Sequence, residues 1–410
     1  MSSRTSTPLI VMILLGLLTM PGTALAQSDD SPEPSGTIGA TTGRILNEAI
    51  EFLNVEDYAS ARESIGRLKL DRLSPYERSR VEQILSSIDN AEGNYGSSRQ
   101  HLQNAIAAGG MNEQETSQAR YNIAQLYMIE EKWAEGAAAL EEWFRTTDSP
   151  NSAAYYLLAV AYYQQEDLQR ALAPAQKAVE LTDRPQASWI ELLLALYLDR
   201  EDFRSALPLS ERLVAMDPTN KSYWVRLASL YQAVEDHDKA AATLQLAYNA
   251  GLLAQDSEYR RLADLLRFTE IPERCARILQ RGLEDDKVEA DADLYEKLAN
   301  CWISAREFDE AIPPLERAAE LSDNGDLFVR LAEVHLQRED WGAVVAALRK
   351  AVDKGDLKDT PYAELLMGIA LYNQEELSEA RRWFLRAAKS DERRKTANDY
   401  IRVIDSKVAS

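Results

Sequence analysis

The stretch Trp224-Val-Arg-Leu-Ala-Ser-Leu-Tyr231 contains the pattern from which we predict the fold. Its large residue, leucine, small residue and aromatic residue are spaced as on one face of an α-helix. Ala240, Leu244 and Ala247 continue the same kind of spacing further along the chain. We therefore predict a pair of antiparallel helices. A small residue in each helix lets the two cross closely, while leucine and tyrosine fill the space between neighbouring pairs.

This pattern recurs along the chain, with a period close to 34 residues. The small residue of the first helix falls at Ala49, Ser86, Ala124, Ala159, Leu194, Ala228, Ala263, Ala299, Ala332 and Gly368. Twelve residues later, the small residue of the second helix falls at Ala61, Ser98, Gly136, Ala171, Ala206, Ala240, Cys275, Ala311, Val344 and Ala380. Because a lone pair cannot bury its apolar stripe, ten pairs are predicted to stack as one array.

By these residues the chain resembles the tetratricopeptide repeat family over about residues 41–391. The resemblance implies an all-α, right-handed superhelical solenoid of about ten helical hairpins plus a C-terminal capping helix. The predicted organisation is a signal peptide over 1–26, an acidic, disordered leader over 27–41, the solenoid over 42–391, and the capping helix and tail over 392–410.

The N-terminus has the features of a secretory signal peptide. Arg4 is its only charge, an apolar run extends from Leu9 to Leu18, and small residues precede a predicted cleavage after Ala26. The apolar run is about half the ~20 residues that a membrane-spanning helix needs. We predict a protein released into the periplasm, with no stable membrane insertion after cleavage. The alternative is a retained N-terminal anchor.

Charge and motifs narrow the class of function. The net charge of −21 disfavours nucleic acids and anionic membranes as partners. The sequence has no Gly-rich phosphate loop with its lysine, no His-Glu-x-x-His and no Gly-x-Ser-x-Gly. The three histidines fall at structural positions of the repeat. We therefore expect no enzyme activity, catalytic residue, cofactor or metal, and we expect other proteins as partners.

One stripe of the third and fourth pairs is a candidate binding surface. In the family that this chain resembles, the corresponding stripe of the first helices lines the concave groove. Here it is uncharged and largely aromatic or apolar, and it consists of Tyr121, Gln125, Met128, Tyr156, Val160, Tyr163 and Gln164. Such a stripe suits an extended segment or a helix laid in a groove. The alternative is that these side chains pack on one another.

Arginines gather on the corresponding part of the seventh pair and its neighbours. The candidates for binding an acidic partner segment are Arg226, Arg260, Arg261, Arg267 and Arg330. In the alternative interpretation, Asp264 neutralises much of this cluster, because it lies four residues from Arg260 and three from Arg261.

Cys275 and Cys301 are the two cysteines of the chain. They fall on the second helix of the seventh pair and the first helix of the eighth, which oppose each other if the helices pack antiparallel. A bridge between them would add about 3 kcal/mol by closing the intervening loop. Both positions are also places for small core residues, so two buried free thiols are the alternative.

Four segments resemble a more specific group. These are LSPYERSRVEQIL (73–85), ARYNIAQLYMIEEKW (119–133), AAYYLLAVAYYQQED (153–167) and LANCWISAREFDEAIPPLE (298–316). They are similar to the periplasmic tetratricopeptide proteins that accompany TonB energy-transduction systems of proteobacteria. The resemblance implies an accessory role beside a complex that energises outer-membrane transport. The alternative is a general periplasmic scaffold for cell-envelope assembly.

Overall fold

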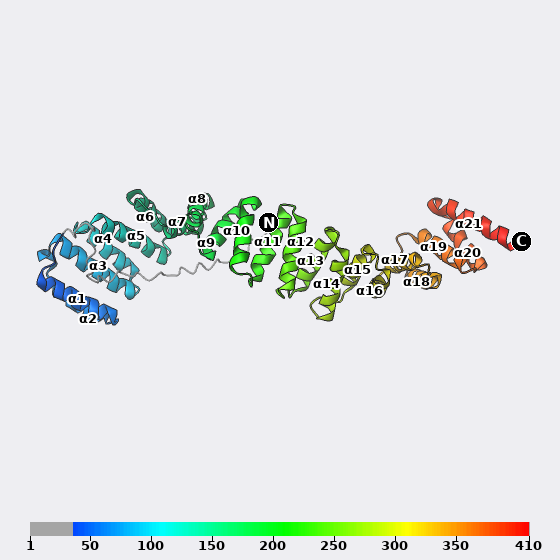
Figure 1. Ribbon diagram of the computed structural model, residues 1–410, viewed down its shortest axis with the longest axis horizontal. Helices are drawn as coiled ribbons and strands as arrows, with labels where there is room; N and C mark the ends of the chain where they lie inside the picture. Colours follow the sequence, from blue (N-terminus) through cyan, green and yellow to red (C-terminus); the bar gives the residue numbers. More distant parts are fainter. Residues whose placement is uncertain (1–35, 410) are drawn as a thin grey trace. The chain divides into compact units, whose positions relative to one another are not determined.

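The computed structural model describes residues 36–409, and this range contains 21 α-helices, one 3-10 helix and no strand (Figure 1). The predicted signal peptide lies outside the described residues, as does the predicted leader up to residue 35. Of the remaining leader residues, 36–39 have no regular secondary structure, and Ala40 and Thr41 already belong to the first helix.

The described chain divides into two units, residues 36–209 and 210–409. The helices of the first unit are α1 (Ala40–Asn54), α2 (Tyr58–Gly66), η1 (Leu70–Arg72), α3 (Pro75–Ala91), α4 (Tyr95–Ala107), α5 (Glu113–Ile129), α6 (Trp133–Thr146), α7 (Ser152–Gln164), α8 (Leu168–Glu180) and α9 (Ala187–Asp199). The boundary between the units falls within α10 (Phe203–Met216).

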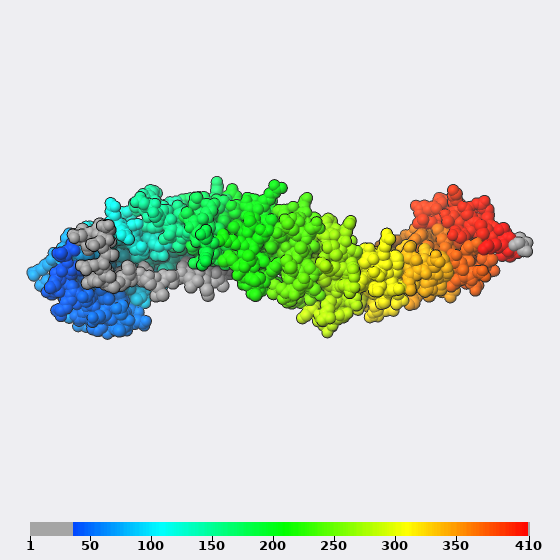
Figure 2. Space-filling view, in the orientation of Figure 1, coloured from blue at the N-terminus to red at the C-terminus, as the bar shows by residue number. Residues whose placement is uncertain are grey.

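The second unit continues the series of hairpins. Its helices are α11 (Lys221–Ala233), α12 (His237–Asn249), α13 (Asp256–Phe268), α14 (Pro272–Glu284), α15 (Ala292–Ser304), α16 (Phe308–Leu321), α17 (Asp326–Gln337), α18 (Trp341–Lys354), α19 (Thr360–Asn373), α20 (Leu377–Ala387) and α21 (Asp391–Ala409). In each unit a helix packs mainly on the helices before and after it in the chain, as Figure 2 shows by the successive bands of colour. Each unit is thus an all-α stack of hairpins.

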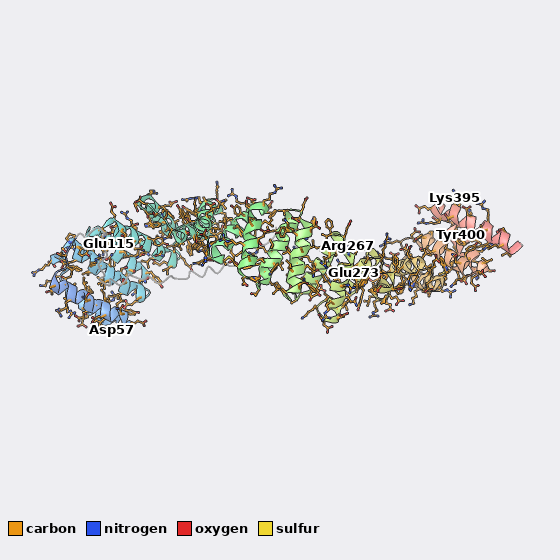
Figure 3. All side chains as sticks on the ribbon, in the orientation of Figure 1. Asp57, Glu115, Arg267, Glu273, Lys395 and Tyr400 are labelled. Carbon is orange, nitrogen blue, oxygen red and sulfur yellow. A yellow bond between two sulfur atoms is a disulfide. The ribbon has the colours of Figure 1, made fainter. Side chains whose placement is uncertain are left out.

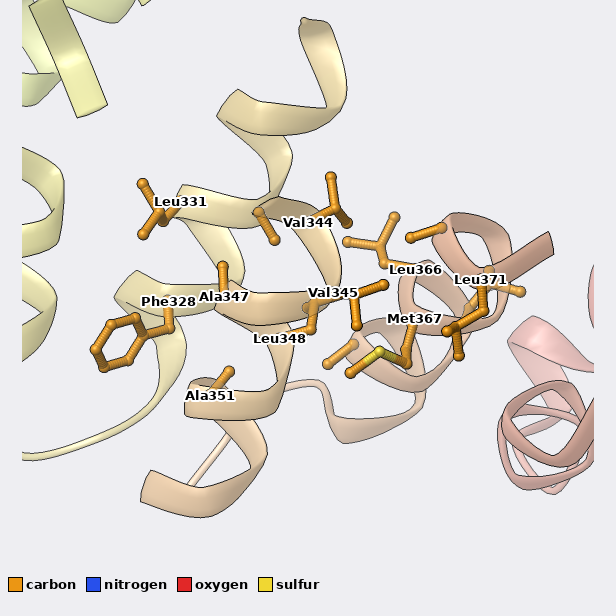
Figure 4. Close-up of a cluster of buried hydrophobic side chains, with 14 of the residues drawn as sticks. Phe328, Leu331, Val344, Val345, Ala347, Leu348, Ala351, Leu366, Met367 and Leu371 are labelled. Atoms are coloured by element: carbon orange, nitrogen blue, oxygen red, sulfur yellow. The ribbon is translucent and has the colours of Figure 1, made fainter. Parts of the chain in front are cut away.

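The predicted crossing positions form the centre of each hairpin. All twenty small-residue positions of the repeat frame are buried, including Leu194, whose side chain is larger than the crossing usually holds. Between hairpins, leucine, valine and aromatic side chains fill the space. Figure 4 shows this for α17 to α19, where Leu331, Leu348 and Met367 lie in one apolar cluster. The sequence period therefore gave the correct register.

The turn inside each hairpin has a residue in the left-handed backbone conformation. In eight of the ten turns this residue is glutamate: Glu56, Glu131, Glu166, Glu201, Glu235, Glu270, Glu339 and Glu375. The other two turns use Gly93 and Arg306. Only glycine adopts this conformation without a steric cost, so most hairpins accept some backbone strain and place a carboxylate at the turn.

A disulfide joins the seventh hairpin to the eighth. Cys275 on α14 and Cys301 on α15 are both buried, with their Cα atoms 5.9 Å apart. This Cα separation lies within the range typical of disulfides. The bridge therefore links helices of two successive hairpins, in addition to their apolar packing.

The last helix covers the end of the second unit. Ala397, Ile401 and Ile404 of α21 are buried in the apolar cluster of hairpins nine and ten. Tyr400, labelled in Figure 3, stacks on Phe384 of α20 with ring centroids 4.7 Å apart. α21 thus shields an apolar face that a further hairpin would otherwise cover.

Candidate functional site

The aromatic stripe of α5 and α7 is mostly part of the core. Tyr121, Met128 and Val160 are buried. The Tyr121 ring packs on Trp143 with centroids 4.8 Å apart, and burial raises the pKa of Tyr121 to about 12. Tyr156 is half-buried and stacks on Trp189 of α9 at 5.5 Å. These rings are occupied by neighbouring helices of the same unit.

The expectation of an exposed aromatic groove at this stripe is therefore wrong for its large apolar members. Gln164 is exposed, whereas Gln125 and Tyr163 are half-buried. The physical reason is that aromatic residues on adjacent helices gain more by packing on one another than by remaining in water. Tyr121 and Tyr156 pack on Trp143 and Trp189, which lie outside the stripe, so the alternative interpretation, packing of the stripe residues on one another, does not describe these two rings either.

Arg260, on α13, is held by acidic groups of its own hairpin and the next. Its guanidinium donates to Asp256 at 2.8 Å, to Asp291 at 3.0 Å and to Asp293 at 2.9 Å. Burial lowers the pKa of Arg260, but the hydrogen bonds to Asp256 and Asp291 and the charges of these carboxylates together raise it above its usual value. With only 15% of its side chain exposed, Arg260 joins hairpin seven to the loop before α15 and has no free donor face for a partner.

Asp264 does not pair with the arginines of its own helix. Its carboxylate lies 3.0 Å from the Nζ of Lys297, which belongs to α15 in the next hairpin. The alternative interpretation is therefore wrong about Asp264, although another acidic residue of the same helix, Asp256, does pair with Arg260. The spacing within α13 would permit pairs of Asp264 with Arg260 and Arg261. In the structure, Lys297 of the next hairpin pairs with Asp264, and Asp291 and Asp293 pair with Arg260.

Arg261 has no carboxylate partner among the described residues. Its Nε donates to Oε1 of Gln232 at 3.0 Å, and its Nη2 donates to Oγ of Ser229 at 2.9 Å. Both acceptors are neutral and lie on α11, in the preceding hairpin. Burial lowers the pKa of Arg261. A guanidinium that is half withdrawn from water and bonded only to neutral oxygens is electrostatically uncompensated.

The other predicted arginines differ in their surroundings. Arg226 on α11 is half-buried and Arg267 on α13 is exposed, and neither forms an ion pair with a residue that the structure describes. Arg330 on α17 lies 3.3 Å from Glu296 of α15. The structure therefore leaves Arg226, Arg261 and Arg267 without an acidic partner in the described part of the chain.

The structure also identifies a cation that we did not predict. Lys297 occupies the same place in the repeat frame as Arg226, Arg261 and Arg330, two residues before the small residue of the first helix. We call these four residues the cation column. The equivalent residues of hairpins three, four, five and ten are Asn122, Leu157, Leu192 and Leu366. Comparing one frame position across all hairpins would have revealed the column from the sequence.

The carboxylates that pair with the cation column neutralise only two of its four positive charges. Asp264 pairs with Lys297 and Glu296 with Arg330, whereas Arg226 and Arg261 are uncompensated. Two of these side chains reach back to the first helix of the preceding hairpin, Arg261 to Ser229 and Lys297 to Asp264. The arrangement is suited to binding carboxylates in a protein whose net charge is −21.

Two properties of residues 36–409 bear on other kinds of site. None of the helices in this range combines the length and apolar character that crossing a membrane requires. Within the same range, histidine, cysteine and acidic side chains form no group suited to holding a metal ion.

Comparison with known proteins supports the repeat family. The tetratricopeptide repeat model matches residues 130–188, 195–257 and 329–395. None of the curated proteins matches the chain. These three segments therefore match tetratricopeptide repeats, a fold that is typically a non-catalytic scaffold for protein–protein interaction.

Solved tetratricopeptide structures are similar to parts of the chain. YrrB, described as having an unusual peptide-binding site, is 17% identical with a TM-score of 0.35, and the match covers 41% of this chain and 84% of YrrB. A tetratricopeptide repeat protein from Parabacteroides merdae is 14% identical with a TM-score of 0.38, covering 73% of this chain and all of the other. The C-terminal part of a protein from Cytophaga hutchinsonii is 12% identical with a TM-score of 0.35, covering 58% and 96%.

Proposed function

We propose that this tetratricopeptide-repeat protein is a periplasmic scaffold that holds an acidic segment of a partner protein along the cation column. Arg261 carries the proposal. Its guanidinium is half-buried, its only acceptors in the described chain are Gln232 and Ser229, and its pKa is lowered by burial. A partner carboxylate would replace neutral acceptors by a charge-assisted hydrogen bond.

The spacing of the column suggests the form of the ligand. Adjacent packed helices lie about 10 Å apart. An extended chain rises about 3.3 Å per residue. A segment with an acidic residue at every third position would therefore present one carboxylate per hairpin. Arg226 and Arg261 are the two members that lack an acidic partner in the described chain, so their hairpins are the expected centre of the site.

Peptide binding tests this site directly. The probe is a fluorescein-labelled twelve-residue peptide with Asp at every third position, measured by anisotropy against the chain from residue 27 to 410. Arg261→Gln should weaken binding about tenfold, which corresponds to about 1.4 kcal/mol. The matched control is Arg274→Gln, which removes an exposed arginine from α14 of the same hairpin. Equal binding by both variants, or equal binding of an Asn-substituted peptide, would contradict the proposal.

Export to the periplasm is the second part of the proposal. It is supported by the signal-peptide features of residues 1–26 and by the placement of Cys275 against Cys301, because disulfides persist mainly in oxidising compartments. N-terminal sequencing of the secreted protein should begin at Gln27. Mass spectrometry without reductant should find residues 275 and 301 linked. An uncleaved N-terminus with two free thiols would argue against export.

The partner that we propose is a periplasmic segment of a TonB-type complex, on the strength of the sequence resemblance. Photo-crosslinking in cells from position 261, with position 274 as control, would identify it. Capture of a periplasmic domain of such a complex from position 261 alone would support this role. Capture of envelope-assembly proteins instead would assign the chain to the alternative, a general periplasmic scaffold, and would contradict the TonB role.

A further inference from the structure

A second surface of the chain lies at the turns of hairpins six and seven, and it has the opposite charge. A hollow of about 430 Å³ opens there, lined by Val234, Glu235, Asp236, His237, Asp238, Phe268 and Thr269. Its residues come from the turn before α12, the first two residues of α12 and the end of α13. None of them belongs to the cation column.

Phe268 is the feature of this hollow that does not fit the repeat. It is 66% exposed, and it packs edge-on against the His237 ring with centroids 4.5 Å apart. The corresponding residues of the other nine hairpins are Asn54, Ala91, Ile129, Gln164, Asp199, Ala233, Ser304, Gln337 and Asn373. Phe268 is thus the one aromatic residue at a position that is mostly small or polar. Packing of the hairpin does not require it.

The same turn lacks the usual polar capping residue. The residue after the left-handed turn position is polar in the other nine hairpins, and in five of them it is aspartate: Asp57, Asp167, Asp202, Asp236 and Asp340. Hairpin seven has Ile271 instead, which is exposed and followed by Pro272 at the start of α14. Two large apolar side chains therefore reach solvent from one turn. Figure 3 labels Arg267 and Glu273, which flank this turn in the chain.

Carboxylates surround the exposed ring. Glu235 and Asp238 line the hollow, are exposed, and form no ion pair with any residue between 36 and 409. Asp236 is different, because it caps α12 through the Lys239 N–H at 3.1 Å and pairs with the Lys239 Nζ at 3.1 Å. Glu270, two residues after Phe268 in the chain, is exposed in the turn of hairpin seven. Two cations close to this turn in the chain, Arg267 and Arg274, form no ion pair with any residue in this range.

We infer that this hollow docks a basic segment of another protein, with an arginine or lysine beside an apolar residue. The exposed face of Phe268 would take the cation or the apolar side chain, and Glu235 and Asp238 would pair with the charge. Charge complementarity decides the occupant. The chain before residue 36 carries Asp29, Asp30 and Glu33 against no Lys or Arg after residue 26, so the same carboxylates would repel it.

The test uses the chain from residue 27 to 410 and the labelled peptide Gly-Arg-Leu-Arg-Gly-Ser at about 0.15 M salt, where distant charges are screened. Phe268→Ser should weaken binding about tenfold, and the double variant Glu235→Gln, Asp238→Asn at least about fivefold. The matched control is Leu246→Ser, which removes a residue on α12 that is 55% exposed. Circular dichroism should show that all variants keep their helices.

Several results would overturn the inference. Equal loss of binding with Leu246→Ser would indicate general apolar attraction. Equal binding of Gly-Arg-Gly-Arg-Gly-Ser would reduce the effect to net charge. A dimer seen by sedimentation in the wild-type chain and abolished by Phe268→Ser would assign the hollow to a second copy. Arg261→Gln should leave binding of the basic peptide unchanged, so the outcome is independent of the acidic-peptide site.

Discussion

The helix crossings of hairpins two and ten occupy the same place in the repeat frame but contain different interactions. In hairpin two, Ser86 of α3 and Ser98 of α4 meet through hydroxyls 2.9 Å apart. In hairpin ten, Gly368 of α19 receives the ring of Phe384 from α20. A Cβ at Gly368 would lie 2.7 Å from that ring.

The polar character of hairpin two extends beyond its crossing. Asp89, with 5% of its side chain exposed, pairs with Arg62 of α2. His101 lies between two carboxylates, with Nδ1 2.6 Å from Glu82 and Nε2 3.3 Å from Asp89. Around hairpin ten the surrounding cluster is apolar. The repeat geometry thus requires close approach at the crossing, and either hydrogen bonds or ring packing can supply the attraction.

The largest effect is expected in the apolar hairpin. Phe384→Ala removes a fully buried ring that stacks on Tyr400, and it should cost about 3–5 kcal/mol. Hydrogen exchange across α19 to α21, together with urea denaturation, would measure the loss. Leu385→Ala, at an exposed position of the same helix, is the control and should change stability by less than about 0.5 kcal/mol. Similar losses in both variants would contradict the description of this core.

In hairpin two, removing one member of the Arg62–Asp89 ion pair should cost more stability than removing both. Arg62→Met leaves the Asp89 carboxylate buried without its guanidinium and should cost about 2 kcal/mol. The double variant Arg62→Met, Asp89→Leu should recover most of that loss, because both partners are then apolar. A double-mutant cycle from urea denaturation would measure the coupling. Strictly additive losses would show that the pair does not act as a unit.

A smaller effect, on the stability of the N-terminal hairpins in acid, is expected from Glu77. The N–H groups of Ser74 and Gly39 lower the pKa of Glu77 to about 2, from 4.5. A lowered carboxyl pKa stabilises the fold above the unfolded value of 4.5, and this contribution is lost as pH falls towards 2. Glu77→Gln should cost about 1 kcal/mol at pH 7 through the weakened capping box. The difference from wild type should shrink between pH 4.5 and 2, and a constant difference would contradict the assignment.

The smallest effect concerns His335, a buried imidazole in hairpin nine. Burial lowers its pKa, against the opposing influence of Asp340 and Glu316, and its Nδ1 has no hydrogen-bond partner in the described chain. The unfolded chain therefore takes up a proton at a higher pH than the folded chain, so stability falls as pH drops below about 6.5. His335→Phe should raise the melting temperature more at pH 5.5 than at pH 8. An equal change at both pH values would leave the imidazole without a role in acid sensitivity.

The repeat frame and the all-α fold followed from the sequence by itself. A small residue at each crossing is a local requirement, and it recurs wherever a hairpin forms, so spacing alone located all twenty buried crossing positions. The same frame contained the cation column, but the pairing of Lys297 with Asp264 is a feature of the tertiary structure. The outlying Phe268 could likewise have been found by comparing one position across the ten hairpins.

The tertiary structure decided which side chains are available to a partner. Tyr121 became core because Trp143 lies against it, and Arg261 stayed without a carboxylate because Lys297 pairs with Asp264. Cys275 is bonded to Cys301 because α14 of hairpin seven packs against α15 of hairpin eight with these two residues opposite each other. Periodicity within a helix determines which way a residue faces. Its contacts depend on side chains supplied by the partner helix or by a neighbouring hairpin, about 20 to 30 residues away, and on how far each of them reaches.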